Sequence, residues 1–141
     1  MKFEDIEIGQ SAEFTKAISD KDVRLFAQIT GDFNPVHLDE AAAARSQFKG
    51  RIAHGMLTAG LISAAIAGKL PGPGSVYLSQ TLRFTAPVRI GEIVTATVQV
   101  IEIIAPKRRV KLSTICRNQK GETVVEGEAL ILVSKETEPA T

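Results

Sequence analysis

Residues 54–70 read HGMLTAGLISAAIAGKL, an almost wholly apolar run that ends at the sequence PGPG over residues 71–74. A helix that is apolar nearly all the way round must be buried rather than half-exposed. The many alanine and glycine residues of this run let another element approach the helix backbone closely. We therefore predict a central buried helix over 54–70 with a sheet wrapped tightly around it.

After this run the hydrophobic pattern changes to a period of two, which is typical of β-strands. Turn-forming residues separate the segments, and their short connections favour antiparallel pairing in the order of the sequence. The predicted fold is therefore α+β, with a meander curled over the central helix. The predicted strands cover residues 76–88, 93–104, 109–118 and 123–134.

The first fifty residues contain signals for a strand over 11–18 and for two helices. Ser19 is a predicted N-cap whose capping box is completed by Asp22, and Gly31 supplies the left-handed conformation that ends a helix. Asp39 is predicted to cap a second, short helix over residues 39–45, because its carboxylate suits the positive end of an alanine-rich helix.

Length and composition limit the classes of function. The chain of 141 residues fits one domain, predicted over 1–134, with a disordered tail over 135–141. Seventeen basic residues against 16 acidic ones give a formal net charge of +1, so no overall field attracts nucleic acid or an anionic membrane. The absence of Trp also removes a stacking platform for single-stranded nucleic acid.

The N-terminus and the cysteine content indicate a soluble cytoplasmic protein. The first five residues, MKFED, carry acids where a signal peptide needs an apolar run, and no uninterrupted apolar stretch of about 18 residues occurs. The lone Cys116 cannot form an internal disulfide. Two histidines and one cysteine match no zinc spacing, so we expect no dedicated metal site.

The sequence GDFNPVH, residues 31–37, places an acid, an amide and an imidazole just after the first helix. These residue types are common in turns, and Asp32 or Asn34 could simply bond to nearby backbone N–H groups. Pro35, however, stiffens the backbone between Asp32 and His37, which favours two side chains held toward one pocket. The central helix then follows, and the free N–H groups of its first turn, at Gly55, suit a developing oxyanion.

These residues resemble a known family. FAQITGDFNPVH over residues 26–37, with Ala43 six residues on, is similar to the hydratase-2 motif of MaoC-like (R)-specific enoyl-CoA hydratases. The resemblance covers nearly the whole chain. Further matching stretches are FEDI at 3–6, IG at 8–9, HGM at 54–56, FTAPV at 84–88 and GE at 91–92.

The resemblance implies a hot-dog fold, a homodimer, and hydration of trans-2-enoyl-CoA to (3R)-hydroxyacyl-CoA with no metal or organic cofactor. It implies that Asp32 and His37 together hold and activate one water. The Gly55 backbone N–H is our candidate donor to the thioester oxygen. Which of the two side chains moves which proton is left open, and so are the acyl chain length and a role in polyhydroxyalkanoate synthesis or fatty-acid metabolism.

Other residues have weaker expectations. Asn34 either orients Asp32 or only closes the turn. Ser63 matches the place of a polar residue near the catalytic carboxylate, or is an ordinary helix serine. Ile66 is expected to line the acyl tunnel or to be a core residue. His54 either braces the loop around Gly55 or is a capping or packing residue at the helix start, and we do not count it as catalytic. The candidates for the CoA phosphates, each alternatively a solvated charge, are Lys49, Arg51, Arg83 and residues 107–109.

Two other functions compete with the hydratase. A dehydratase would run the same chemistry in reverse, on CoA or acyl carrier protein esters, and its catalytic residues would be the same. A non-catalytic acyl-CoA-binding module would need neither Asp32 nor His37. A hot-dog thioesterase is disfavoured, because such an enzyme would place its carboxylate on the central helix and residues 56–70 contain no acid.

Overall fold

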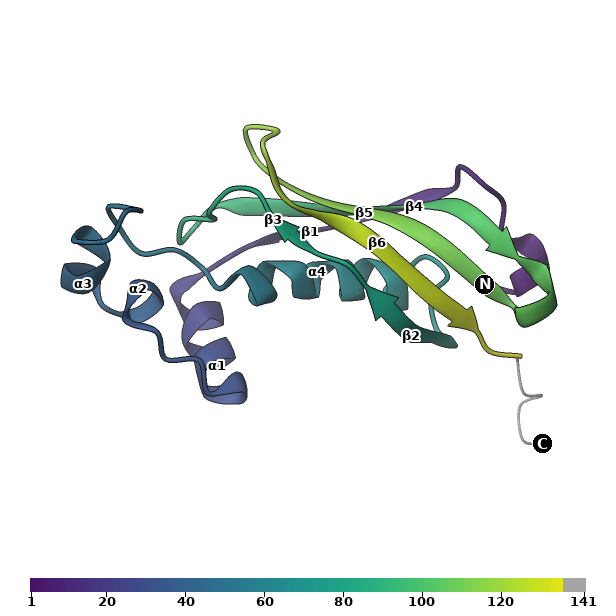
Figure 1. Ribbon diagram of the computed structural model, residues 1–141, viewed down its shortest axis with the longest axis horizontal. Coiled ribbons are helices and arrows are strands. Elements are labelled where there is room, and N and C mark those ends of the chain that lie inside the picture. The colour runs from purple at the N-terminus through teal and green to yellow at the C-terminus, as the bar shows by residue number, and fades with distance from the viewer. Residues whose placement is uncertain (136–141) are drawn as a thin grey trace.

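A computed structural model, in which residues 1–135 are described, shows one antiparallel sheet curved around a helix (Figure 1). The sheet has the strand order β1-β4-β5-β6-β2, with the short β3 paired to β6. The strands are β1 (Ser11–Ala17), β2 (Ser75–Gln80), β3 (Arg83–Phe84), β4 (Ile93–Ile104), β5 (Arg109–Asn118) and β6 (Thr123–Val133). The α+β prediction is therefore confirmed, and the arrangement is that of a hot-dog fold.

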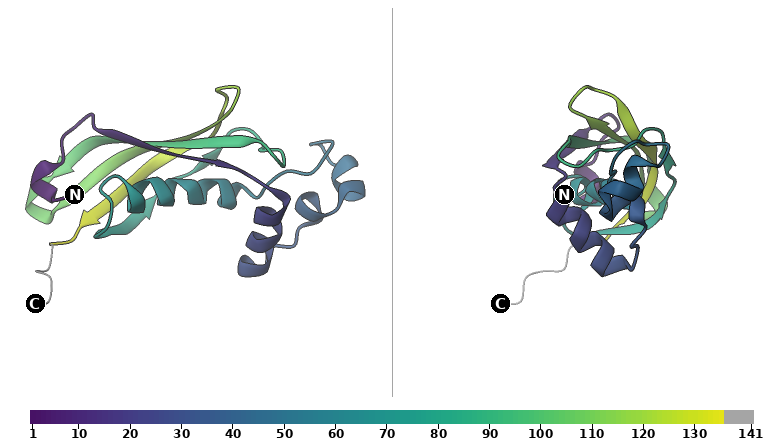
Figure 2. Two further views of the ribbon diagram at one scale, coloured as in Figure 1. Left: turned by 180° about the vertical axis from the view of Figure 1, so that it is seen from behind. Right: turned by 90° about the vertical axis from the view of Figure 1, so that its left-hand side faces the viewer.

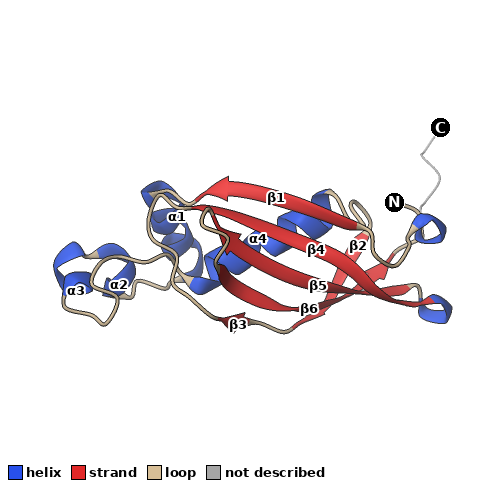
Figure 3. Ribbon diagram, turned by 90° about the horizontal axis from the view of Figure 1, so that it is seen from above, coloured by secondary structure: helices blue, strands red, loops and turns tan. Residues whose placement is uncertain are grey.

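The central helix α4 (Gly55–Gly68) lies under the concave face of the sheet, as the view from above also shows (Figure 3). Its inward side packs Ile62, Ala65 and Ile66 against inward residues of the strands, among them Val98 and Leu112. All of these side chains are at most 1% exposed. Small residues on α4 let the strands approach closely, so the sheet and the helix share one aliphatic core.

The helices α1 (Asp20–Thr30), α2 (Pro35–Leu38) and α3 (Glu40–Ala44) lie beyond one end of the sheet, at the end where α4 begins, with α3 farthest from α4 (Figure 2). The capping box of Ser19 and Asp22 is present, and Gly31 ends α1 with a φ of 83°. Asp39 caps α3 through the backbone N–H groups of residues 41 and 42. The predicted cap signals are thus confirmed, whereas the single turn α2 was not predicted.

The predicted strand over 76–88 was wrong in length and in pairing. It divides into β2 and β3, and both of these strands pair with β6 rather than with β4. At the break the backbone oxygen of Thr81 lies so close to Gly127 that any side chain there would collide with it. The connection over residues 85–92 is long enough to carry the chain past the end of α4 to the far side of the sheet, which alternation alone does not reveal.

One stripe of α4 is exposed in the single chain, contrary to the expectation of complete burial. It consists of Met56, Gly60, Ser63 and Ala67, which recur on one side of the helix. Among residues 1–135, no helix has the length and hydropathy needed to cross a membrane. The tail predicted to be disordered lies, from residue 136 on, outside the described residues.

Candidate active site

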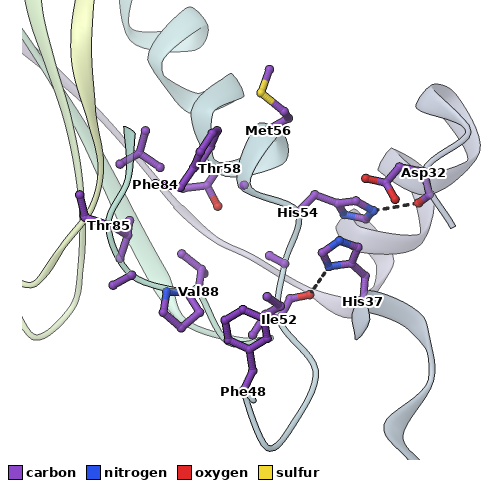
Figure 4. Close-up of a pocket in the computed structure, with 16 residues that line it drawn as sticks. Asp32, His37, Phe48, Ile52, His54, Met56, Thr58, Phe84, Thr85 and Val88 are labelled. Carbon is purple, nitrogen blue, oxygen red and sulfur yellow. Dashed lines mark hydrogen bonds between the residues drawn. The ribbon is translucent and has the colours of Figure 1, made fainter. Parts of the chain in front are cut away.

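A cavity of about 450 Å³ opens between the turn that follows α1, the short helix α2 and the first turn of α4 (Figure 4). Asp32, His37 and His54 gather at one side of the cavity, whereas Thr58 lies away from them beside Phe84. Gly55 also lines the cavity, and most of the remaining lining residues are apolar. The other lining residues are Phe48, Ile52, Ala53, Met56, Phe84, Thr85, Ala86, Pro87, Val88, Val124 and Val125. The predicted catalytic set of Asp32, His37 and Gly55 is therefore brought to one cavity.

Asp32 lies in the turn between α1 and α2 and is exposed in the single chain. Its Oδ1 accepts a hydrogen bond of 3.2 Å from the backbone N–H of Asn34, which fixes one carboxylate oxygen. The side chain of Asn34 turns the other way and accepts from the N–H of Val36, so it caps α2. Asn34 thus closes the turn with its side chain and holds Asp32 with its backbone.

His37 is 8% exposed and is fixed by a hydrogen bond of 2.8 Å between its Nδ1 and the carbonyl oxygen of Ile52. Because a carbonyl only accepts, Nδ1 carries the proton and Nε2 keeps a free lone pair. Burial lowers the pKa of His37 below its usual 6.5, and nearby His54 and Arg51 lower this pKa further. The bond to Ile52 and the charge of Asp32 oppose that shift. His37 is therefore neutral at pH 7 and able to accept a proton.

His54 links the acidic turn to the central helix. Its Nε2 donates to the backbone oxygen of Asp32 over 3.0 Å, and its ring stacks on His37 with centroids 3.9 Å apart. It precedes α4 without capping the helix through its side chain. His54 therefore does not cap α4, and its stacking on His37 and its hydrogen bond to the Asp32 backbone hold the segments that carry both predicted catalytic side chains.

Gly55 begins α4, and no acceptor for its backbone N–H occurs among residues 1–135. A Cβ at this position would lie 2.6 Å from Cδ1 of Phe84. The phenyl ring therefore packs directly on the glycine, a contact that only glycine permits. A free N–H at the positive end of a 14-residue helix is a suitable donor to an oxygen that gains negative charge.

The same cluster can be considered as a metal site, because ligand atoms of Asp32, His37 and His54 all lie within 4.8 Å of one another. The two imidazole rings, however, are stacked and inclined by only 29°. The two ring planes are therefore nearly parallel with centroids 3.9 Å apart, so an ion at the roughly 2.1 Å of a Zn–N bond from both rings would lie out of the plane of at least one of them. The geometry suits a water held between Asp32 and His37 better than it suits a shared ion.

The structure does not bring Ser63 and Ile66 to this cavity in the single chain. Ser63 lies on the exposed stripe of α4, whereas Ile66 is 1% exposed and part of the core. Helical spacing correctly placed Ser63 on the same face of α4 as Met56. The spacing does not predict which part of the protein, if any, packs against that face.

Of the basic residues proposed to contact the CoA phosphates, some lie near the cavity and others do not. Arg51 is engaged internally, since its Nε donates to the backbone oxygen of His37 and its NH2 group to Asp20. The turn over residues 105–108 lies at the other end of the sheet from α1 and α4's first turn (Figure 1). Lys49 and Arg83 adjoin the lining residues Phe48 and Phe84 and remain candidates.

Sequence reasoning did not identify Thr58, Phe48 or Phe84 as parts of the site. Thr58 stands in an apolar run and looks like any threonine of a buried helix. Phe48 falls outside every element predicted from the sequence, Phe84 falls in the predicted strand over 76–88, and neither pattern indicates an approach to the site. Only the tertiary arrangement reveals these neighbours.

The fold and this cavity define a hot-dog protein with a carboxylate and an imidazole paired at the entrance to its central helix. The chain belongs to the MaoC-like domain family, whose model matches residues 3–124. A relative from Methylorubrum extorquens named 3-hydroxybutyryl-CoA dehydratase is 54% identical over 136 residues, covering 96% of this chain and 86% of the relative.

A second relative and a solved structure are also similar to this chain over nearly its whole length. A Rhodospirillum rubrum protein named (R)-specific enoyl-CoA hydratase is 51% identical, over 93% of this chain and 90% of that protein. The solved structure of the unliganded R-hydratase PhaJ1 from Pseudomonas aeruginosa superimposes with a TM-score of 0.90 at 52% identity, covering 99% of this chain and 91% of that one.

Proposed function

We propose that this protein is an (R)-specific enoyl-CoA hydratase, which adds water to trans-2-enoyl-CoA to give (3R)-hydroxyacyl-CoA. The observation that carries the proposal is the convergence of Asp32, His37 and the free N–H of Gly55 on one cavity with apolar walls. The name of the Rhodospirillum relative, which is 51% identical to the chain, supports the same reaction.

In this reaction one water lies between the carboxylate of Asp32 and the Nε2 of His37. These two groups take one proton from the water as its oxygen bonds to C3, and they deliver a proton to C2 from the same side. Charge that develops on the thioester oxygen is stabilised by the N–H of Gly55, a contribution worth about 3 kcal/mol for one such donor. Delivery from one side gives syn addition.

The reverse reaction, dehydration of a (3R)-hydroxyacyl thioester, uses the same groups. The name of the Methylorubrum relative supports this direction for CoA esters. We propose the apolar walls around Val88, Val124 and Val125 as the place of the acyl chain and Lys49 and Arg83 as contacts of the CoA phosphates.

We further propose that the protein is a homodimer. The exposed stripe of α4 belongs to a helix that is apolar all round, and the edge strand β2 exposes Val76, Tyr77 and Leu78 to between 40% and 43%. An edge with consecutive exposed apolar side chains is a surface for pairing. Light scattering after gel filtration tests this, and Leu78→Lys is expected to shift the protein toward monomer.

The assignments of Ser63 and Ile66 are part of this proposal. In a dimer Ser63 would face the partner rather than solvent, and Ile66 would support the wall of the acyl tunnel from the core. We also propose a domain over residues 1–134 and a cytoplasmic location, in which the buried and unpaired Cys116 stays reduced.

The test is the loss of enoyl-thioester absorbance when purified protein meets crotonyl-CoA and longer trans-2-enoyl-CoA esters, followed by chiral analysis of the product. The proposal predicts rapid loss and a (3R) alcohol. A (3S) alcohol, or binding of the esters without turnover, contradicts it. The same esters on acyl carrier protein, and detection of free CoA thiol, distinguish the carrier-protein dehydratase and the thioesterase.

A further inference from the structure

Thr58, at the end of the first turn of α4, carries a buried hydroxyl group that has no hydrogen-bond partner among the described residues. The residue is 1% exposed. A threonine inside a helix usually bonds its hydroxyl to a carbonyl one turn back, and this one does not. Because an unpaired buried hydroxyl destabilises a fold, such a group in a native structure calls for an explanation.

Thr58 lines the cavity described above, where it stands beside Phe84 (Figure 4), although its hydroxyl oxygen is almost wholly covered by protein atoms in this structure. The neighbouring walls, which include Val88 and Val124, offer it no acceptor. The backbone at this position is fixed independently, since the carbonyl oxygen of Thr58 accepts a weak hydrogen bond from the buried Sγ of Cys116 at 3.8 Å. The hydroxyl is thus held by a rigid turn packed on β5.

The position of Thr58 relative to Gly55 indicates what the hydroxyl binds. The two residues are three apart and therefore lie on one face of α4, separated by about one turn. Side chains of a helix lean toward its N-terminus, so the hydroxyl of Thr58 leans toward the first turn, where the N–H of Gly55 is free. Both groups are donors, and both line the same cavity.

We propose that the Thr58 hydroxyl is a second hydrogen-bond donor to the thioester oxygen of the substrate, acting beside the Gly55 N–H. This inference rests on the proposed hydratase function. As the water oxygen bonds to C3, the electron pair of the C2=C3 bond moves toward C1 and the thioester oxygen becomes negative. Thr58 keeps its proton throughout, and the charge returns to carbon when C2 is protonated.

The alternative partner of the Thr58 hydroxyl is an ordered water that hydrogen-bonds to it without contacting the thioester. A water there would not gain charge in the transition state, so its loss would not slow the reaction. The two possibilities therefore differ in kcat, and they also differ in the vibration of the bound thioester carbonyl.

The experiment compares Thr58→Val, which keeps the shape and removes the hydroxyl, with Thr58→Ser, which keeps the hydroxyl. For hydration of crotonyl-CoA we expect kcat to fall roughly 10- to 100-fold in Thr58→Val and to be largely retained in Thr58→Ser, since loss of one such donor has effects of about this size or larger. Thr114→Val is the matched control, because Thr114 is buried but lies outside the cavity. This control should keep its kcat.

A second readout needs no turnover. Infrared spectra of bound butyryl-CoA, labelled with carbon-13 at the thioester carbonyl, should show a higher C=O stretching frequency in Thr58→Val than in the wild type and in Thr58→Ser. Thr58→Ala serves if the valine variant fails to fold, with the same expected shift.

Unchanged kcat and unchanged carbonyl frequency in Thr58→Val overturn the inference and leave the proposed function standing. If the wild-type protein hydrates no enoyl thioester, the proposed function itself is wrong and this inference falls with it. The two failures are therefore distinguishable in one set of measurements.

Discussion

The imidazole rings of His37 and His54 are stacked with their centroids 3.9 Å apart, and each ring donates one N–H to a backbone carbonyl. The acceptors are Ile52 for His37 and Asp32 for His54. The two histidines therefore connect the turn that contains Asp32, the segment before α4 and α4 itself. It leaves the Nε2 of His37 as a free lone pair beside Asp32, which is the arrangement that a general base requires.

The fall of kcat/KM at low pH, which is the acid limb of the pH profile, should reflect the protonation of His37. Burial lowers the pKa of His37, so the neutral base persists to lower pH than an exposed histidine would allow. We expect kcat/KM for crotonyl-CoA to fall only as the pH drops through a value below about 6.5. A plateau that ends above that value would contradict this assignment.

His54→Phe should keep the aromatic stack and lose the hydrogen bond to the Asp32 carbonyl. Removing His54 also removes one of the neighbours that lower the pKa of His37, so the acid limb should move to higher pH. We expect kcat to fall about tenfold, because Asp32 is less firmly placed. A variant with wild-type kcat and an unmoved acid limb would show that His54 only fills space.

Gly55→Ala places a methyl group where the Phe84 ring lies, at 2.6 Å from its Cδ1. The ring is 53% exposed and can swing aside, so we expect a loss of only about 1 kcal/mol in the free energy of unfolding. Activity should fall at least roughly tenfold, because the displaced ring and the methyl group obstruct the thioester oxygen's place.

The double variant Gly55→Ala with Phe84→Ala should recover the lost stability, and a double-mutant cycle measures that coupling. Gly68→Ala, at a position with open space around it, is the matched control and should not reduce activity. Additive effects of the two substitutions in the cycle would show that the contact between residues 55 and 84 is unimportant.

The side chain of Arg51 holds the backbone of His37 in place through a hydrogen bond. Its Nε donates to the carbonyl oxygen of His37 over 2.7 Å, and its side chain is only 9% exposed. Arg51→Met should lower the free energy of unfolding by about 1–3 kcal/mol, since that carbonyl loses its partner. Thermal melts should show almost no change for Arg24→Met, which breaks a surface ion pair with the same Asp20. Equal losses in the two variants would contradict the bracing role.

Local signals made the fold largely predictable from the sequence. Ser19, Gly31 and Asp39 carry cap chemistry that acts within one turn, and the apolar run from Gly55 to Gly68 predicts a central helix. The approach of Asp32 to His37 was also predictable, because the stiff segment around Pro35 separates them by only five residues.

Nonlocal features were not predictable in this way. Alternation around residue 81 predicts a strand but not its partner, so the pairing of β2 and β3 with β6 was missed. A periodic pattern places Ser63 and Met56 on one face of α4 and does not tell what covers that face. The sequence also does not single out Thr58. Only the tertiary structure shows that its buried hydroxyl has no hydrogen-bond partner among the described residues.

The central claim is that Asp32 and His37 together activate one water. The most direct measurement is the hydration of crotonyl-CoA by Asp32→Asn, which keeps the shape of the side chain and removes its charge, next to Asp5→Asn as a control at the other end of the molecule. We expect a loss of at least about 10²-fold in kcat for Asp32→Asn, with butyryl-CoA still bound, and wild-type rates for Asp5→Asn. Wild-type turnover to the (3R) alcohol by Asp32→Asn would contradict the central claim.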